Sequence, residues 1–100
     1  MALQITNTAG IFELNGELNS QNVSSLNNHF NALLDCSKMI TLSLNKLNTI
    51  DKCAVNAIAS LYQNAMSRNK VFYILGQENS IVNNQFQSAN LNYILHSNSL

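Results

Sequence analysis

Apolar and polar residues alternate in two short segments near the start of the chain, and this pattern predicts a β-hairpin. Leu3 and Ile5 alternate with polar neighbours, and residues 11–14 form a second strand-like segment that ends before Gly16. The pair Ala9-Gly10 between them suits a tight turn, because glycine tolerates backbone angles that other residues avoid. The chain is therefore expected to open with two antiparallel strands.

Two longer segments place their apolar residues at helical spacing. Residues 20–35 are expected to form a helix with Ser20 as its N-cap, and residues 52–68 a helix with Asp51 as its N-cap. The apolar stripe of the first helix consists of Val23, Leu26, Phe30, Leu33 and Leu34. The broader stripe of the second consists of Ala54, Val55, Ile58, Ala59, Leu61, Tyr62, Ala65 and Met66. A shorter third helix is predicted over residues 80–86.

The segment 38–45 alternates most regularly and indicates how the sheet is covered. Ile40, Leu42 and Leu44 fall on one side, and the opposite side carries Met39, Thr41 and Ser43. A parallel strand covered by helices on both faces would be apolar on both faces, so this alternation predicts helices on one face. Residues 70–75 are expected to form a further strand that ends at Gly76. Residues 90–95 are expected to form a short strand or extended piece, and the tail to Leu100 is expected to fray.

The predicted order of elements is strand, strand, helix, strand, helix, strand, helix and a short ending. Strand–helix–strand units need right-handed crossovers and a mostly parallel sheet, to which the hairpin adds an antiparallel strand. We therefore expect an α/β fold with a mixed, mostly parallel sheet of four to five strands and helices packed mainly on one face. Residues 1–100 show no linker-like stretch and are expected to form a single domain.

Charge is scarce in this chain. Asp, Glu, Lys and Arg make up 10% of the residues, against roughly 25% in ordinary domains, and eighteen asparagines fill many of the polar positions. The basic residues are dispersed at Lys38, Lys46, Lys52, Arg68 and Lys70. Nucleic acids and anionic membranes bind clustered positive charge, which this sequence lacks. It also has no apolar stretch long enough to span a membrane and no signal-peptide pattern. We expect a cytoplasmic protein that binds no nucleic acid and does not insert into a membrane.

The residue types that carry catalysis or bind metals are few and dispersed. His29 is expected on the solvent-exposed face of its helix. Neither His29 nor His96 has a Cys or carboxylate at the spacing of metal ligands. The three glycines are isolated and cannot form a phosphate-binding loop. We therefore expect no enzyme activity, no metal and no cofactor. Cys53 suggests a different function, because a thiol in the first turn of a helix beside Lys52 would suit a redox or thiol sensor. A cysteine is nevertheless more often a buried apolar filler, and that interpretation is favoured.

Over residues 5–95 the chain resembles the STAS domain family, typified by bacterial anti-sigma factor antagonists. One segment that carries the resemblance is Leu14-Asn15-Gly16-Glu17-Leu18 at the end of a strand. The other is the strand from Ile40 and the loop that opens the second long helix, Leu47-Asn48-Thr49-Ile50-Asp51-Lys52-Cys53-Ala54-Val55. Gly76, Phe86 and Ala89-Asn90-Leu91 match later landmarks. The resemblance implies a STAS fold and a role in binding another protein.

The chain departs from the family pattern in the loop that opens the second long helix. There the family reads roughly aspartate, serine, serine, glycine, leucine, and in the antagonists a partner kinase phosphorylates the first serine. Here Asp51 is followed by Lys52, Cys53 and Ala54. Lysine has no hydroxyl to accept phosphate, and its charge is opposite to that of phosphoserine. The chain therefore has no phosphoacceptor at the family position.

From the resemblance we expect a non-catalytic, protein-binding regulatory module. The expected partner-binding residues are Asn48, Thr49, Asp51, Lys52, Cys53 and Asn56. The resemblance implies a kinase-like anti-sigma ATPase as partner or, alternatively, the ATPase subunit of an ABC-type lipid transporter, and the missing serine weakens the first. Lys52 is either simply solvated or pairs with an acidic group or a phosphate. A homodimer and the sensor role of Cys53 stay open.

Overall fold

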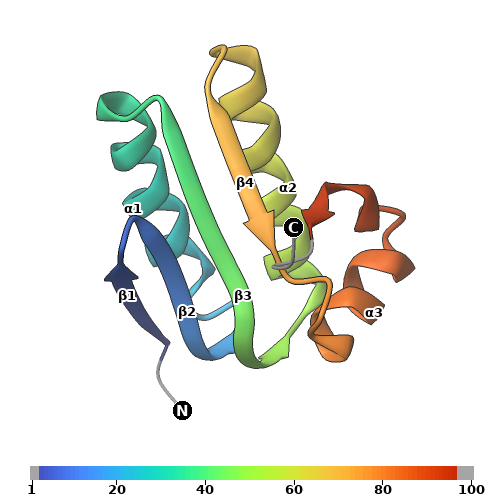
Figure 1. Ribbon diagram of the computed structural model, residues 1–100. Coiled ribbons are helices and arrows are strands. Elements are labelled where there is room, and N and C mark those ends of the chain that lie inside the picture. Colours follow the sequence, from blue (N-terminus) through green and yellow to red (C-terminus); the bar gives the residue numbers. More distant parts are fainter. Residues whose placement is uncertain (1–2, 97–100) are drawn as a thin grey trace.

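The computed structural model describes residues 3–96 as a sheet packed against a layer of helices (Figure 1). In chain order the elements are β1 (Gln4–Thr8), β2 (Ile11–Leu18), α1 (Val23–Cys36), β3 (Met39–Ile50), α2 (Lys52–Ser67), β4 (Val71–Leu75), α3 (Ser80–Ser88), the 3-10 turn η1 (Asn92–Ile94) and β5 (Leu95–His96). The five strands lie in the order β1-β2-β3-β4-β5. Strand β1 is antiparallel to β2, and the other neighbours are parallel.

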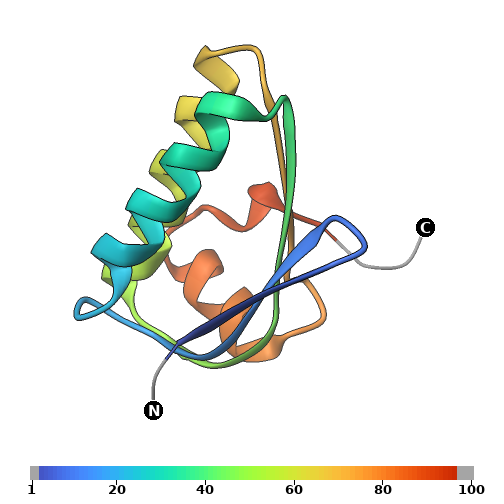
Figure 2. The ribbon, with the colours of Figure 1, turned by 90° about the vertical axis from the view of Figure 1, so that its left-hand side faces the viewer.

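All three helices lie on the same face of the sheet (Figure 2). The side chains that β3 directs toward the helices, Ile40, Leu42 and Leu44, are buried, whereas Met39 at the start of the strand is 65% exposed on the opposite face. The expected α/β fold, with a mixed, mostly parallel sheet and helices on one face, is confirmed. The alternation in β3 predicted this one-sided cover because a single face of the strand meets the helices.

The opening hairpin turns through Ala9 and Gly10, as predicted. Both residues have positive φ, 53° and 82°, and the strands pair directly on either side of them at Thr8 and Ile11. Positive φ at both central residues is the type I′ turn, whose twist matches that of the strands it joins. The turn fixes the pairing of β1 with β2 along its whole length.

Strand β3 is longer than the alternation predicted. It continues beyond Asn45 to Ile50 and carries an extra residue at two places relative to β2. At the first, Glu13 pairs with Ser43 but Asn15 with Lys46; at the second, Gly16 pairs with Leu47 but Glu17 with Thr49. Each such bulge shifts the alternation by one residue and bends the strand, so a period of two no longer describes the pattern. The predicted loop over residues 48–50 is therefore wrong, since these residues belong to the strand.

The first helix begins at Val23 and not after Ser20, so the predicted N-cap is wrong. Asn22 occupies the cap position, but its side chain folds back over the preceding turn, where Oδ1 accepts from the Asn19 N–H at 2.9 Å and Nδ2 donates to the Glu17 carbonyl at 2.8 Å. These bonds hold residues 19–22 as a turn. Asparagine favours such local bonds over a helical conformation.

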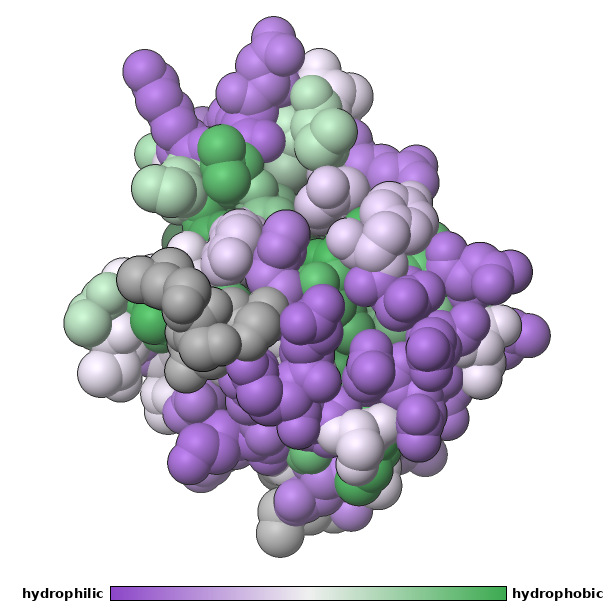
Figure 3. All heavy atoms as spheres, turned by 45° about the vertical axis from the view of Figure 1, so that its right-hand side comes forward, coloured by the Kyte–Doolittle hydropathy of each residue, from purple (hydrophilic) through white to green (hydrophobic). Residues whose placement is uncertain are grey.

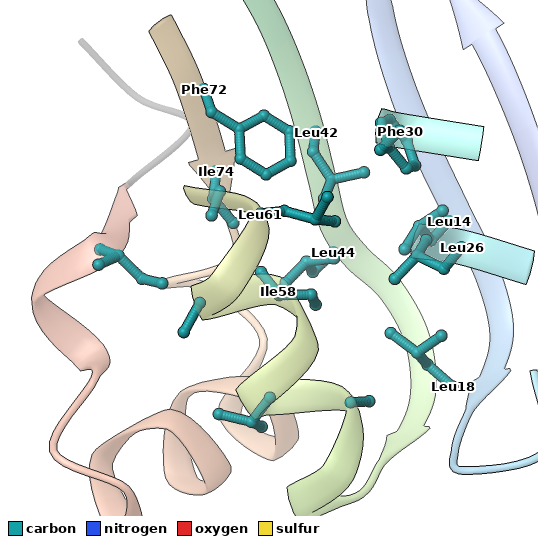
Figure 4. Packing of buried hydrophobic residues seen from close by; sticks show 14 of the residues in the cluster. Leu14, Leu18, Leu26, Phe30, Leu42, Leu44, Ile58, Leu61, Phe72 and Ile74 are labelled. Carbon is teal, nitrogen blue, oxygen red and sulfur yellow. The ribbon is translucent and has the colours of Figure 1, made fainter. Parts of the chain in front are cut away.

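The core lies between the sheet and the layer of three helices, with Val82 and Phe86 contributed by α3. Figure 4 shows Leu26 and Phe30 from α1 and Ile58 and Leu61 from α2 directed toward the strand side chains. Phe30 contacts the rings of Phe12 and Phe72, with centroids 5.6 Å and 6.1 Å away. The predicted stripes are largely confirmed, with the exceptions that Val23, Leu33 and Tyr62 are half-buried and Met66 is 59% exposed.

The face of the sheet without helices carries several exposed apolar side chains. Met39, Val71 and Tyr73 belong to it, and Tyr73 stacks on His96 with ring centroids 4.3 Å apart. Hydrophilic residues nevertheless dominate the part of the surface drawn in Figure 3, where hydrophobic atoms appear as separate patches between them. Ser43, which the alternation placed on this more polar side, is 4% exposed.

The last predicted strand is mostly not a strand. Residues 92–94 form the 3-10 turn η1, and β5 is limited to Leu95 and His96, which pair with Ile74 and Leu75. The expectation of a frayed tail falls on residues 97–100, which lie outside the described part of the chain. The sheet thus has five strands, the upper number expected.

Two helices end with asparagine in the left-handed conformation. Asn69 after α2 and Asn90 after α3 have φ of 58° and 59°. The next N–H in each case reaches back to the helix, from Lys70 to the Ala65 carbonyl and from Leu91 to the Phe86 carbonyl, both at 2.8 Å. This is the Schellman arrangement, in which glycine is usual and asparagine is tolerated.

The carboxyl ends of α1 and α2 are joined by two basic residues. Arg68 Nη2 lies 2.8 Å from Asp35 Oδ1, and the ammonium of Lys70 donates to the Leu34 carbonyl in the last turn of α1. Cations near a helix carboxyl end interact favourably with its dipole and its unpaired carbonyls. The exposed ion pair contributes less than about 1 kcal/mol, because solvent screens it.

The left-handed geometry at Asn69 gives a test of these helix ends. Replacing Asn69 by valine is expected to lower the free energy of unfolding by about 1–2 kcal/mol, because a β-branched side chain is disfavoured at this φ. Asn69→Gly should leave it unchanged or raise it. Urea denaturation measures both, with Asn84→Val at an exposed position within α3 as a control that should cost less than about 1 kcal/mol. Equal losses for Asn69→Val and Asn69→Gly would contradict the assignment.

Candidate partner-binding site

The residues singled out by the sequence gather where β3 ends and α2 begins (Figure 1). Asn48 and Thr49 are exposed on the last residues of β3, and Lys52 and Cys53 are exposed in the first turn of α2. Asn56 follows one helical turn after Lys52, and it is exposed as well. The structure thus places these five exposed residues close to one edge of the sheet, the carboxyl edge of the parallel strands, whereas Asp51 between them is half-buried.

Asp51 connects two neighbouring elements through its side chain. Its Oδ1 accepts from the Ala54 N–H at 2.9 Å, which confirms it as the N-cap of α2. Its Oδ2 accepts from the Ser20 N–H at 3.1 Å, and its own N–H donates to the Leu18 carbonyl at 3.2 Å. The carboxylate therefore fixes the start of α2 relative to the turn between β2 and α1. Both oxygens are occupied within the molecule, so Asp51 positions the surface.

A second anchor of this edge, Asn79, was missed in the sequence. Its Nδ2 lies 3.1, 3.3 and 3.0 Å from the carbonyls of Leu44, Asn45 and Leu47, which belong to the bulged part of β3. Its Oδ1 accepts from the N–H groups of Ile81 and Val82 and so caps α3. An asparagine directly before a predicted helix is an N-cap signal and could have pointed to this residue. Its contact with β3 could not be read without the bulges.

The exposed face of α2 continues the surface away from β3. Lys52, Asn56 and Ser60 follow each other at intervals of four residues and are all exposed. No hydrogen bond or ion pair of the Lys52 side chain to any residue of the described range 3–96 is present, and the first turn of α2 has no acidic residue. A lysine at the positive end of the helix dipole is slightly unfavourable; because the Asp51 carboxylate already caps this end, an anionic group of another molecule would interact mainly with the Lys52 ammonium.

Cys53 is exposed, which contradicts its interpretation as a buried apolar filler. The apolar stripe of α2 begins one residue later, at Ala54 and Val55, and Cys53 faces outward with Lys52. Cys36 is exposed too and lies in the last turn of α1, where its Sγ is 3.4 Å from the Ala32 carbonyl. Cys53 thus lies at the amino end of a helix and Cys36 at the carboxyl end of another.

The histidines take part in aromatic contacts. His29 is exposed, as expected, and lies edge-on to Phe12 and Phe30, with ring centroids 6.2 Å and 5.1 Å away, and His96 stacks on Tyr73. Within the described residues, no three His, Cys, Asp or Glu side chains come close enough to hold a metal ion. Nor does any helix described here have the length and apolar character needed to cross a bilayer.

Comparison with known proteins gives a family match. The model of the STAS domain family matches residues 1–98. No curated protein sequence matches the chain. The solved structure of the anti-sigma factor antagonist SpoIIAA in its unphosphorylated form is similar with a TM-score of 0.79 at 16% identity, covering 98% of this chain and 89% of that one.

Two further solved structures are similar. The Bacillus cell fate determinant SpoIIAA in its phosphorylated form gives a TM-score of 0.71 at 14% identity, with 98% of this chain and 92% of that one covered. An anti-sigma factor antagonist from Mycobacterium paratuberculosis gives 0.75 at 12% identity, with 99% and 86% covered. At these identities the likeness shows a common fold.

The bonds of Asp51 predict the cost of its removal. Asp51→Ala is expected to lower the free energy of unfolding by about 1–2 kcal/mol, because the cap of α2 and the bond from Ser20 are both lost. Asp51→Asn keeps one acceptor oxygen and should cost less. In urea denaturation, Asp35→Ala serves as the control, since it removes an exposed ion pair worth less than about 1 kcal/mol. The described role of Asp51 would be refuted by a cost no larger than that of Asp35→Ala.

Proposed function

The chain belongs to the STAS domain family, and from this premise we propose that it acts as a non-catalytic regulatory module that binds another protein through the carboxyl edge of its sheet. The recognition surface comprises the exposed residues Asn48, Thr49, Lys52, Cys53 and Asn56, held in place by Asp51. The proposal includes residues 1–100 as one domain and the cytoplasm as its location.

The observation that carries this proposal is the rigid presentation of an exposed, polar surface. Asp51 and Asn79 tie the end of β3 and the starts of α2 and α3 to their neighbours, so the surface needs little ordering when a partner binds. Little ordering means a smaller entropic cost of association. Lys52 is the one charged group among the five exposed residues, so hydrogen bonds and shape provide most of the specificity.

Regulation of this module differs from a switch at a phosphoserine. Lys52 stands where the family loop has its first serine, and its ammonium has the opposite charge to a phosphate group. Phosphorylation at position 52 therefore cannot switch binding through this surface on or off. A constant positive charge at the start of α2 favours a partner with an acidic group at the contact.

An ATPase is the proposed partner. Of the two kinds that the family suggests, the ATPase subunit of an ABC-type lipid transporter fits better than a kinase-like anti-sigma factor, because a kinase would find no hydroxyl at Lys52. The association would then serve assembly or stability of the transporter and would not be reversed by a phosphoryl group.

A thiol-sensor function is a second candidate, favoured by the exposure of Cys53 at the amino end of α2. Cys36 is a matched reference within the same molecule, because it is exposed in the last turn of α1. A helix amino end stabilises a thiolate and a carboxyl end does not. A sensor therefore requires Cys53 to alkylate at least about tenfold faster than Cys36 near neutral pH. Equal rates, measured by mass spectrometry on Cys36→Ser and Cys53→Ser variants, would eliminate this candidate.

Reversal of the charge at Lys52 tests the main proposal. With a partner ATPase captured from the native cell and then purified, Lys52→Glu is expected to weaken binding at least about tenfold, because it places a carboxylate against the acidic group of the partner. Asn56→Arg on the same face should weaken it as well, by steric conflict. Isothermal titration calorimetry measures the affinities.

Lys38→Glu is the control, since Lys38 is exposed before β3 at the other end of the molecule and the change of charge is identical. Wild-type affinity is expected for this variant. If Lys52→Glu and Lys38→Glu bind equally well, the proposed surface is wrong. If no protein is captured and a small molecule co-purifies instead, the module function itself is wrong.

A further inference from the structure

The outer edge of β1 forms a second surface, remote from Lys52. Strand β1 is the first strand of the sheet, its outer side has no partner strand among residues 3–96, and in Figure 2, which looks at this edge, no helix covers it. We propose that two copies of the chain pair antiparallel through β1 and join their sheets into one, with Thr6 of each copy at the twofold axis.

The hairpin register determines which backbone groups point outward. A two-residue turn makes the flanking residues, Thr8 and Ile11, a hydrogen-bonded pair, and hydrogen-bonded pairs alternate along an antiparallel ladder. Thr6 and Gln4 therefore direct their N–H and C=O groups toward β2 as well. Ile5 and Asn7 direct theirs to the outer edge, where the described chain supplies no partner.

These outward groups are complementary to themselves. When Thr6 of one copy faces Thr6 of the other, Ile5 lies opposite Asn7 of the second copy and Asn7 opposite its Ile5. Each of these two pairs exchanges two N–H···O=C bonds, so the twofold arrangement satisfies all four outward N–H groups of the two residues in both copies. The threonines meet in a cross-strand pair, which is favourable in sheets.

The charge pattern favours a second copy over a charged partner strand. Residues 3–12 contain no charged residue, and Glu13 on β2 is the first. Two identical edges therefore meet without repulsion. Exposed edge strands are usually protected by lysine, proline or a bulge, whereas β1 contains none of these and pairs with β2 in unbroken register. The opposite sheet edge differs, because β5 covers the second half of β4.

A hollow on the helix side of β1 adds apolar surface near the same edge. Its volume is about 550 Å³, and it is lined by Leu3, Ile5 and Leu26 together with polar residues around the turn to α1. Leu3 and Ile5 are half-buried there. A further strand beyond β1 would bring the side chains of its helix-facing side to the rim of this hollow.

The small size of the contact sets its strength. A strand of five residues spans roughly 17 Å, so the area buried per copy stays well below the ~800 Å² of a standard stable interface. The dimer is therefore weak and reversible, with a dissociation constant in the range of about 10 μM to 1 mM. At lower concentrations the chain is a monomer.

Sedimentation equilibrium between about 10 μM and 2 mM tests this pairing. The wild type should pass from monomer to dimer. Asn7→Pro should weaken the dimer at least tenfold, because it removes an outward N–H and leaves the ladder with β2 intact. Thr6→Lys should also weaken it, because two ammonium groups meet at the axis. Asn84→Lys on α3 adds the same charge elsewhere and should dimerise like the wild type.

A mixture of Thr6→Lys and Thr6→Glu chains gives a result that does not depend on the folding of a proline variant. The mixed pair places opposite charges at the axis, so it should form heterodimers more readily than either variant forms homodimers. A wild-type chain that stays monomeric to 2 mM, or dimers that neither Thr6→Lys nor Asn7→Pro weakens, would overturn the proposal. Lys52→Glu should leave dimerisation unchanged, so this result is independent of the partner-binding surface.

Discussion

The carboxylate of Asp51 is the contact on which the geometry of the carboxyl edge depends. One side chain bonds to α2 through the Ala54 N–H and to the turn before α1 through the Ser20 N–H. Because β3 leads directly into α2 at this residue, the bend between strand and helix is made by a single residue that cannot move independently of its neighbours. The side chain of Asn79 likewise bonds to two elements, donating to the Leu44 carbonyl of β3 and accepting from the Val82 N–H of α3. The hydrogen bonds of Asp51 and Asn79 therefore fix the backbone that carries the exposed residues of this edge.

The parts of the fold that rest on one regular period could be predicted from the sequence. The alternation of Ile40, Leu42 and Leu44 predicted the one-sided sheet, and the stripe from Ala54 to Ala65 predicted the buried face of α2. Prediction failed where a local hydrogen bond or a bulge replaced the period. The two extra residues in β3 hid its second half, and the side-chain bonds of Asn22 moved the start of α1 beyond Ser20.

The candidate site shows the same division between pattern and local bonding. The residues Asn48 to Asn56 could be singled out from the sequence, and Asp51 could be identified as a cap, because caps have a short-range signal. That Asn48 and Thr49 belong to a strand depended on the bulges of β3, and that Asn79 reaches the carbonyls of β3 depended on contacts across 30 or more residues. Sequence periodicity carries no information about such contacts.

The direction of the helices has a consequence for a molecule without net charge. None of the three α-helices has an acidic residue in its first turn, but an acidic residue lies just before each start: Glu17 before α1, Asp51 at the cap of α2 and Glu78 before α3. Their amino ends all follow the carboxyl ends of parallel strands, so the positive helix ends and these three carboxylates share one side of the domain. The negative ends of α1 and α2 meet Arg68 and Lys70. Side-chain charges of opposite sign thus offset the helix dipoles at both ends of this neutral chain, so another molecule meets it with little long-range electrostatic steering.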